Sequence, residues 1–246
     1  MTRFFIPTSQ IRGNEVILEG ADHRHLVKVL RKTVGAEIQV LTGKGEEFKA
    51  RIIAIGPDRT VAELDESIRR QTEPRLKIRL VQSLPKAAKF EWIIQKNTEL
   101  GVSSFQPVLS ERSLIRLERD TKVKKQERWQ KIIKEAAQQS GRQIIPDLQP
   151  VLEWEEFIAA FPAGLVLIPW EAETGQSLKT VLKSFEILPE EITVIIGPEG
   201  GFAQNEVEQV RQLGAIPVSL GPRILRTETA GLVAATALLY HFGELD

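Results

Sequence analysis

The chain has 246 residues, 42% of them hydrophobic, and its 33 Lys plus Arg balance 33 Asp plus Glu. This length allows one large core or two smaller ones, and two is the expectation. The absence of cysteine excludes disulfides, thiol catalysis and cysteine-ligated zinc, and three histidines are too few and too badly placed for a metal site.

No segment of the sequence resembles a membrane span or a leader. The longest apolar stretch, residues 230–240, is too short to cross a bilayer, and the opening MTRFF lacks the hydrophobic run of a signal peptide. We therefore expect a soluble cytoplasmic protein with no membrane partner. Because the formal charge is zero, any nucleic-acid partner has to be held by local basic patches.

Short β-like runs dominate the first 72 residues. They are separated by turn signals, and their sequences are EVILE, EIQVLT, EFKARIIAI and TVAELDE. One basic segment, residues 23–32, is inserted among them, and Leu26, Val27 and Leu30 would share one face of a helix there. The pattern predicts a small β-barrel over residues 1–72.

From residue 73 onward, strand-like apolar runs alternate with longer helical stretches. This alternation predicts an α/β domain with a mostly parallel sheet over residues 73–246. A second basic helix is expected around residues 122–131. Basic helix faces are common in proteins that bind no RNA, so a solvated face is the alternative for both basic segments, and it is favoured for the second.

Polar and glycine-rich signals gather where three apolar strands of the α/β domain end. The three segments are GLVLIPWE, ITVIIGPEGG and IPVSLGPRILRTETA. Ligands of open parallel sheets sit outside the carboxyl ends of the strands. The functional pocket is therefore expected at these loops.

The middle loop, GPEGG at residues 197–201, permits a close approach of a ligand to its backbone. A tight turn with no ligand is the alternative, and it is favoured for an isolated motif of this kind. The spacing fits neither a dinucleotide fingerprint nor a phosphate-binding P-loop, and the Glu199 carboxylate would repel a triphosphate. Glu199 is expected either to cap the loop through backbone N–H groups or to orient a cation such as Arg226.

The motif VIIGPEGGF, followed by SLGPRILRTETA, resembles the small-subunit (16S) ribosomal RNA uracil-N3 methyltransferases of the knotted SPOUT superfamily. HRHLVKVLR with GAEIQVLTGKGEEFKARI resembles the PUA-like RNA-binding domain of that family. Two further segments, QKNTELGVSSFQPVLSERS and EAAQQSGRQIIPDL, resemble parts of its SPOUT domain. The resemblance spans nearly the whole chain, with five motifs in order.

This resemblance implies a PUA-like barrel followed by a SPOUT domain with a deep trefoil knot, and S-adenosylmethionine bound in the knot crevice. It also implies a homodimer whose site is completed across the interface, for which the nearly all-apolar helix expected at residues 230–242 is suitable. An ordinary core helix is the alternative there. The cofactor-binding residues that it implies are Leu167, Ile168, Pro169, Glu171, Ile196, Gly197, Pro198, Glu199, Gly200, Gly201, Leu220, Gly221, Ile224, Leu225 and Arg226.

Uracil N3 becomes nucleophilic only as its proton leaves, which places negative charge on the flanking carbonyl oxygens. Arg226 is the candidate for stabilising that charge. Glu228 or Thr227 is the candidate orienter or proton relay, and no residue is assigned as general base. The alternative for Arg226 and Glu228 is a helix-start pair, with the glutamate complementing the helix dipole.

The implied partner is 16S ribosomal RNA. The target uracil has to lie where its N3 is unpaired or where the base is flipped out. We expect phosphate contacts that position the RNA from Arg3, His25, Arg31, Lys86, Arg112 and Arg142. Arg112 and Arg142 are expected in polar loops of the α/β domain. Ala203 stands where a serine commonly caps the next helix, so one cap hydrogen bond is expected to be missing.

Two other functions stay open at this point. One is another SPOUT methyltransferase, which would act on a ribose 2′-hydroxyl of tRNA or rRNA. The other is a non-catalytic RNA-binding ribosome-assembly factor with a vestigial cofactor pocket. An N-terminal barrel fused to ILRTETA speaks against the first, and the intact GPEGG and ILRTETA loops speak against the second.

Overall fold

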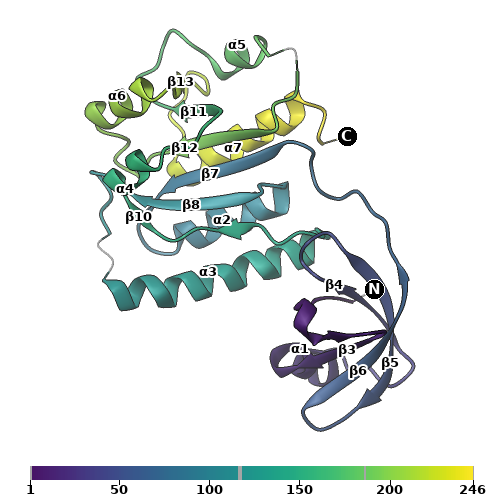
Figure 1. Cartoon of the computed structure of the whole chain (residues 1–246). Coiled ribbons are helices and arrows are strands. Elements are labelled where there is room, and N and C mark those ends of the chain that lie inside the picture. The colour runs from purple at the N-terminus through teal and green to yellow at the C-terminus, as the bar shows by residue number, and fades with distance from the viewer. Residues whose placement is uncertain (1, 116–117, 186, 246) are drawn as a thin grey trace. The chain divides into compact units, whose positions relative to one another are not determined.

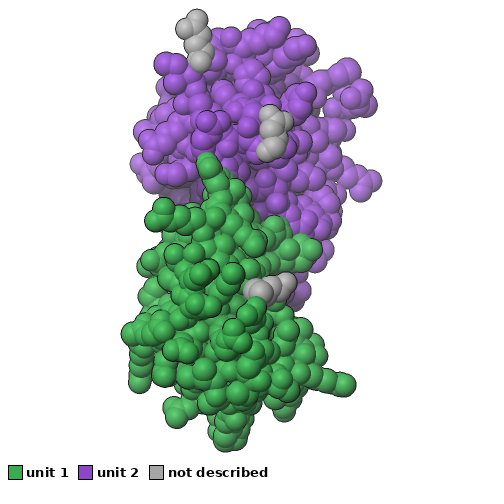
Figure 2. Space-filling view, turned by 90° about the vertical axis from the view of Figure 1, so that its right-hand side faces the viewer, with its two compact units in different colours: residues 1–73, 137–145 green, residues 74–136, 146–246 purple. Residues whose placement is uncertain are grey.

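The structure is a computed structural model that describes residues 2–115, 118–185 and 187–245. The chain divides into two compact units (Figure 2): unit 1 comprises Met1–Glu73 and Ala137–Ile145, and unit 2 comprises Pro74–Ala136 and Pro146–Asp246. Unit 1 therefore contains a second segment, 137–145, which the sequence had assigned to the α/β domain. The predicted boundary, between residues 72 and 73, lies one residue before the end of the first segment.

Unit 1 is built on one six-stranded sheet with the order β1-β4-β5-β6-β3-β2. Figure 1 labels β3, β4, β5 and β6 of this sheet. Neighbouring strands are antiparallel, except that β1 pairs with β4 in parallel. The sheet encloses a core that includes Phe4, Leu18, Ile38 and Ile52. The strands are β1 (Arg3–Phe5), β2 (Ile11–Arg12), β3 (Glu15–Glu19), β4 (Glu37–Leu41), β5 (Glu47–Ile55) and β6 (Arg59–Ser67).

The predicted basic helix of unit 1 is confirmed, but it is not a regular α-helix. α1 (Gly20–Arg24) continues into a π-helical turn, η2 (His25–Val29), in which the backbone N–H of Leu30 donates to the carbonyl of His25 at 3.0 Å. Leu26 is buried in the core from this turn. A short one-turn 3-10 helix, η1 (Thr8–Gln10), precedes β2.

A buried polar network holds segment 137–145 within unit 1. The Arg142 guanidinium donates from Nη2 and Nε to Glu73 Oε2, at 2.6 and 3.0 Å, and the backbone N–H of Gln143 donates to Glu73 Oε1 at 2.9 Å. Gln143 Nε2 donates to Glu47 Oε2 at 3.0 Å, and Arg3 Nη2 lies 3.4 Å from the same oxygen. These charge-assisted bonds offset the cost of burying the Glu73 carboxylate and Glu47 Oε2, whereas Glu47 Oε1 is buried without a hydrogen bond from the described residues.

Unit 2 contains the predicted parallel sheet, with the order β10-β8-β7-β12-β11-β13, and β9 pairs with β8. Every strand pair in this sheet is parallel, so the predicted sheet type is confirmed. The strands are β7 (Lys77–Ser83), β8 (Ser104–Leu109), β9 (Asp147–Leu148), β10 (Leu152–Glu153), β11 (Leu165–Pro169), β12 (Glu191–Ile196) and β13 (Ile216–Val218).

Helices cover both faces of this sheet, which explains why its strands are apolar on both sides. Val81 and Ile195 belong to a core cluster with side chains of α4 and α6, whereas the adjacent Leu80 and Ile196 lie beside Gly231 of α7. α2 packs on α7, and Phe90 of α2 meets Trp129 of α3 edge to face. The helices are α2 (Lys89–Leu100), α3 (Arg119–Ser140), α4 (Trp154–Ala159), α5 (Leu178–Leu182), α6 (Gln204–Gln212) and α7 (Thr227–His241).

Within the described ranges, no helix is both long enough and apolar enough to span a bilayer. α7 buries Ala234, Ala235, Leu238 and Leu239, but Tyr240 is exposed.

The last described residues are hydrogen-bonded to the segment just before β7. Glu244 accepts hydrogen bonds from the backbone N–H and the Nε of Arg75, at 2.7 and 2.9 Å. Both ends of unit 2 are therefore anchored to each other.

Candidate active site

The three strand-end loops that the sequence singled out line one cavity of about 960 Å³ in unit 2. They follow β11, β12 and β13, which are neighbours or near neighbours in the sheet. Parallel strands bring their carboxyl ends to one edge, so loops distant in sequence converge there. A fourth element, the start of α2, contributes Lys89.

Most of the predicted cofactor-binding residues line this cavity, and two do not. Leu167 and Ile168 are buried inside β11, because the strand continues to Pro169 and packs their side chains into the core. The predicted residues that line the cavity are Pro169, Glu171, Ile196, Gly197, Pro198, Glu199, Gly200, Gly201, Leu220, Gly221, Ile224, Leu225 and Arg226. Residues that the sequence analysis missed include Lys89, Trp170, Ser177, Thr180, Phe202 and Arg223.

The GPEGG loop has a conformational reason for its last glycine. Gly201 has a φ of +66°, and a Cβ there would overlap the carboxylate of Glu171, which comes from the neighbouring loop. At Gly197 a Cβ would lie 3.1 Å from the Phe202 ring. The left-handed backbone at Gly201 thus favours glycine without any ligand, whereas at Gly197 a Cβ would need only a small shift of the Phe202 ring. The close approach of a ligand to this backbone stays a prediction.

Thr227 joins three elements at the floor of the site. Its buried hydroxyl donates to the carbonyl oxygen of Gly197 at 2.5 Å and accepts from Gln82 Nε2 at 2.9 Å. The start of α7 is thereby fixed to the ends of β12 and β7. The single hydroxyl proton of Thr227 is therefore already engaged within the protein.

Glu199 does both of the things that the sequence left open, but its cation is Lys89. One carboxylate oxygen accepts from the backbone N–H of Lys86 and from Lys89 Nζ, both at 3.0 Å. Burial acts to raise the pKa of Glu199, but the hydrogen bonds from Lys89 and from backbone N–H groups outweigh it and hold the pKa below its ordinary value. Glu199 is therefore an ionised anchor for the turn that precedes α2.

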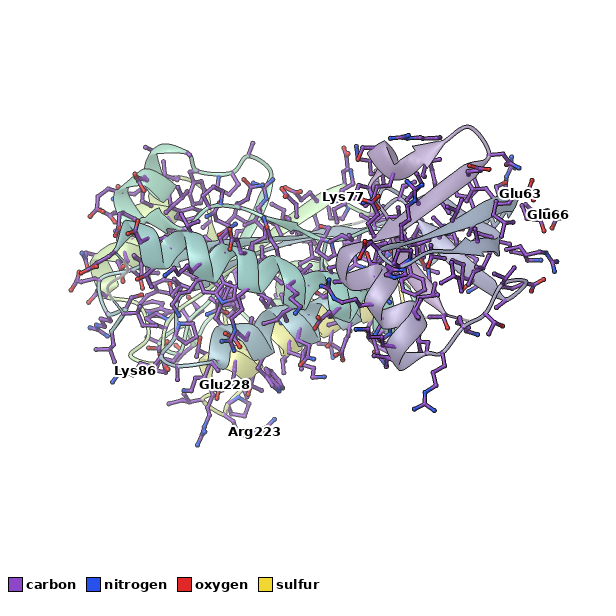
Figure 3. All side chains as sticks on the ribbon, turned by 90° about the horizontal axis from the view of Figure 1, so that it is seen from below. Glu63, Glu66, Lys77, Lys86, Arg223 and Glu228 are labelled. Carbon is purple, nitrogen blue, oxygen red and sulfur yellow. The ribbon has the colours of Figure 1, made fainter. Side chains whose placement is uncertain are left out.

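Glu228 and Arg226 stand at the beginning of α7, on the rim of the cavity. Arg226 is the N-cap residue, and its carbonyl accepts from the N–H groups of Thr229 and Ala230, both at 2.9 Å. Its guanidinium is exposed and has no partner among the residues that the structure describes. Figure 3 shows Lys86, Glu228 and Arg223 on the same side of unit 2.

A buried carboxylate supports the GPEGG loop from behind. Glu206 of α6 accepts hydrogen bonds from the backbone N–H groups of Glu111 and Ala203, both at 2.8 Å. Burial raises its pKa, even though these two hydrogen bonds act in the opposite direction. Ala203 has no side-chain acceptor, so half of the capping box is present and the other half is missing, as expected.

The six residues predicted to contact RNA divide into two groups. His25, Arg31, Lys86 and Arg112 are exposed, and Arg112 Nη1 donates to the carbonyl of Gly200 at 3.1 Å. Arg3 and Arg142 are mostly buried in the ion pairs of unit 1. Arg142 was expected in a loop of the α/β domain, but segment 137–145 belongs to unit 1, where Glu73 engages its guanidinium.

Comparisons with known proteins agree with this architecture. The family model described as an RNA methyltransferase domain matches residues 72–239, and the RNA methyltransferase PUA domain matches residues 18–65. A ribosomal RNA small subunit methyltransferase E of Bacillus subtilis is 34% identical over 98% of this chain and 96% of its own length. The protein of the same name from Synechocystis is 38% identical over 94% of this chain and 75% of its own.

Two solved structures are also similar. The ribosomal RNA small subunit methyltransferase E of Neisseria gonorrhoeae, bound to S-adenosyl methionine, has a TM-score of 0.87 and 33% identity, covering 98% of this chain and 97% of its own. A putative methyltransferase of Legionella pneumophila, in complex with the cofactor SAM, has a TM-score of 0.88 and 31% identity over 98% of both chains. The chain belongs to the ribosomal RNA small subunit methyltransferase E family of RNA methyltransferases.

Proposed function

We propose that the protein transfers a methyl group from S-adenosylmethionine to N3 of a uridine in 16S ribosomal RNA. The observation that carries the proposal is the convergence of three strand-end loops, the helix-start Arg226 and the half-buried Glu228 on one cavity. A substrate within the small ribosomal subunit places the protein in the cytoplasm.

The cavity suits this cofactor in size and charge. Its volume of about 960 Å³ is within the range of small-molecule sites. Its charged lining residues are Lys89, Glu171, Glu173, Glu199, Arg223, Arg226 and Glu228. Carboxylates outnumber cations among them, which favours a ligand that carries a sulfonium and an ammonium group. When bound, S-adenosylmethionine supplies an electrophilic methyl group, whose bonding electron pair stays on sulfur as the N3 lone pair forms the new bond.

The residues of this chain then have to manage one proton and one developing negative charge. The proton leaves N3, and the charge spreads to the flanking carbonyl oxygens of the uracil. The Arg226 side chain is exposed at the rim, so a change of its rotamer can bring the guanidinium toward those oxygens. Glu228 lines the cavity beside Arg226, and its Oε2 accepts no hydrogen bond from the described residues, so Glu228 is the carboxylate that we propose takes the proton.

The RNA has to present N3 outside base pairing, either in an irregular region or by base flipping. The exposed candidates for phosphate contacts are His25 and Arg31 in unit 1 and Lys86 and Arg112 in unit 2. Arg3 and Arg142 remain proposed RNA contacts only through whatever part of each guanidinium their ion pairs leave accessible. We expect the contacts to position the RNA and the pocket to select the base.

The trefoil knot and a homodimer are further parts of the proposal. Exposed apolar side chains on α2 and α7, namely Trp92, Val233 and Tyr240, support an interface on these helices. Sedimentation equilibrium should give twice the chain mass, 27.6 kDa for one copy. A single species at the mass of one chain over the working concentration range would contradict the dimer.

The test of the function is a label-transfer assay. The protein is incubated with methyl-labelled S-adenosylmethionine and either assembled small subunits or naked 16S RNA, and the RNA is digested to nucleosides. We expect label on N3 of uridine. Label on a ribose 2′-oxygen would identify a different methyltransferase, and no label on either substrate would favour a non-catalytic RNA-binding factor.

A further inference from the structure

Lys89 lies between two carboxylates that come from different elements. Its Nζ is 3.0 Å from Glu199 Oε1, in the loop after β12, and 3.7 Å from Glu228 Oε2, in the first turn of α7. Glu228 Oε2 is shielded from solvent and accepts no hydrogen bond in the described part of the chain. The ammonium therefore lines the cavity between one carboxylate with which it forms a hydrogen bond and a second that it approaches.

The turn that delivers Lys89 is held in an uncommon conformation. Ala87 has a φ of +56°, a region that residues with a Cβ rarely adopt. Glu199 accepts hydrogen bonds from residues before and after Ala87, namely from the backbone N–H of Lys86 and from the ammonium of Lys89. Strained backbone of this kind persists where its surroundings fix it, and it is frequent at functional sites.

We propose that Lys89 is a catalytic cation that stabilises the charge on a carbonyl oxygen of the target uracil as the N3 proton leaves, and that Glu199 positions it. This inference rests on the proposed function. An ammonium has three donors; Glu199 takes one, Glu228 lies near a second, and one remains for the uracil oxygen. Because the ion pair fixes the charge in advance, it needs no reorganisation at the moment of reaction.

Two other roles for Lys89 predict different measurements. If Lys89 only holds α2 against the pocket loops, its loss lowers the rate equally at every pH. If it binds the carboxylate of S-adenosylmethionine, its loss weakens cofactor affinity. A cation that stabilises the uracil anion instead lowers the pKa of the bound base, so its loss moves the curve of rate against pH toward higher pH.

The groups that face Lys89 can also titrate or carry charge. They are Glu199 from the loop after β12 and Glu228 from α7, and the remaining charged groups of the cavity are Glu171, Glu173, Arg223 and Arg226. None of them is replaced in a Lys89 variant, but the loss of Lys89 also raises the pKa of Glu199. The displacement is therefore assigned to Lys89 by two comparisons: with Lys96→Met, and with Glu199→Gln, in which no carboxylate titrates at position 199.

The experiment compares Lys89→Met, Lys89→Arg and Glu199→Gln with Lys96→Met. Lys96 lies on the same helix, pairs with Glu99 at 2.8 Å and lies outside the cavity, so its variant removes the same charge elsewhere. Lys89→Met should lower the rate at neutral pH about 100-fold, with the curve displaced to higher pH and cofactor affinity by calorimetry preserved. Lys89→Arg should retain most of the rate of the unmodified protein. The rate of Glu199→Gln should lie between those of Lys89→Met and the unmodified protein.

A uniform loss of rate, a large loss of cofactor affinity, or a curve that stays in place would each overturn the catalytic role. A second readout is independent of turnover: the titration of the Glu199 carboxyl carbon by NMR in cofactor-free protein. Lys89→Met should raise the pKa of Glu199, because the hydrogen bond from Lys89 helps to hold it low, and Lys96→Met should not.

An unchanged Glu199 titration in Lys89→Met would overturn the positioning role, even in a protein with full activity. Failure of the proposed function gives a different pattern. Unmodified protein would then transfer no label to RNA, which removes the catalytic role, while the NMR shift would still be present and the pairing of Glu199 with Lys89 would stand.

Discussion

Replacing Arg226 with alanine should lower the rate of methyl transfer about 100-fold or more, while S-adenosylmethionine binding stays measurable by calorimetry. Removal of one preorganised donor to a developing oxyanion typically costs 10²- to 10³-fold in rate. The Arg226 guanidinium has no side-chain partner in the described structure, and the N-cap bonds of this residue use its carbonyl. The variant should therefore fold normally and bind the cofactor, and only its rate of methyl transfer should fall.

The matched control for Arg226→Ala is Arg211→Ala. Arg211 is an exposed arginine of α6 that lies outside the cavity, with Nη1 4.0 Å from Glu208 Oε2. Its replacement should leave both the rate and cofactor binding unchanged. An Arg226→Ala enzyme with the unmodified rate would remove Arg226 from the proposed role, and a parallel loss of cofactor binding would reassign it to the cofactor.

Gly101→Ala should produce the largest loss of stability among single glycine replacements in unit 2, about 2–4 kcal/mol. Gly101 ends α2 with a φ of +118°, and its N–H donates to the carbonyls of Asn97 and Thr98, both at 3.2 Å. A Cβ there would lie 2.7 Å from Pro74 Cγ, closer than real Cβ contacts allow. Backbone strain and overlap with the stiff proline ring therefore both lower the free energy of unfolding of this variant.

Tryptophan fluorescence during urea unfolding measures this loss, because all four tryptophans, at positions 92, 129, 154 and 170, lie in unit 2. Gly214→Ala is the control. Gly214 follows α6 with a φ of +100°, but a Cβ there meets nothing within 4 Å, so only the strain remains. Equal losses in the two variants would show that the contact with Pro74 relaxes at no cost.

Much of the fold follows from local patterns in the sequence. The alternation of apolar strands with amphipathic helices predicts the parallel sheet, and the glycine-rich strand ends predict which edge carries the site. Leu167 and Ile168 were named on the family resemblance, whose cofactor loop begins at Leu167, and not on the local pattern. In the structure β11 continues to Pro169, so the side chains of these two residues are buried in the core.

Lys89 was missed because its role depends on contacts across 110 residues of sequence. In the sequence it is one of several lysines near the start of a helix, and Lys86, three residues earlier, was chosen as an RNA contact instead. The positive φ of Ala87 has no sequence signature, since alanine rarely adopts it. Arg142 was misplaced for a related reason: no composition shift marks the point inside α3 where the chain passes from unit 2 to unit 1.

That passage has a consequence for the modularity of the protein. Unit 1 is assembled from two stretches of chain, and the carboxylate of Glu47, which has no exposed surface, accepts Gln143 from the second stretch. A fragment that ends at Glu73 would bury this charge with Arg3 as its remaining partner and would also lose the guanidinium that pairs with Glu73. Residues 1–73 of unit 1 therefore cannot be transferred to another enzyme as one continuous fragment. A fusion protein that contains unit 1 also has to contain residues 137–145.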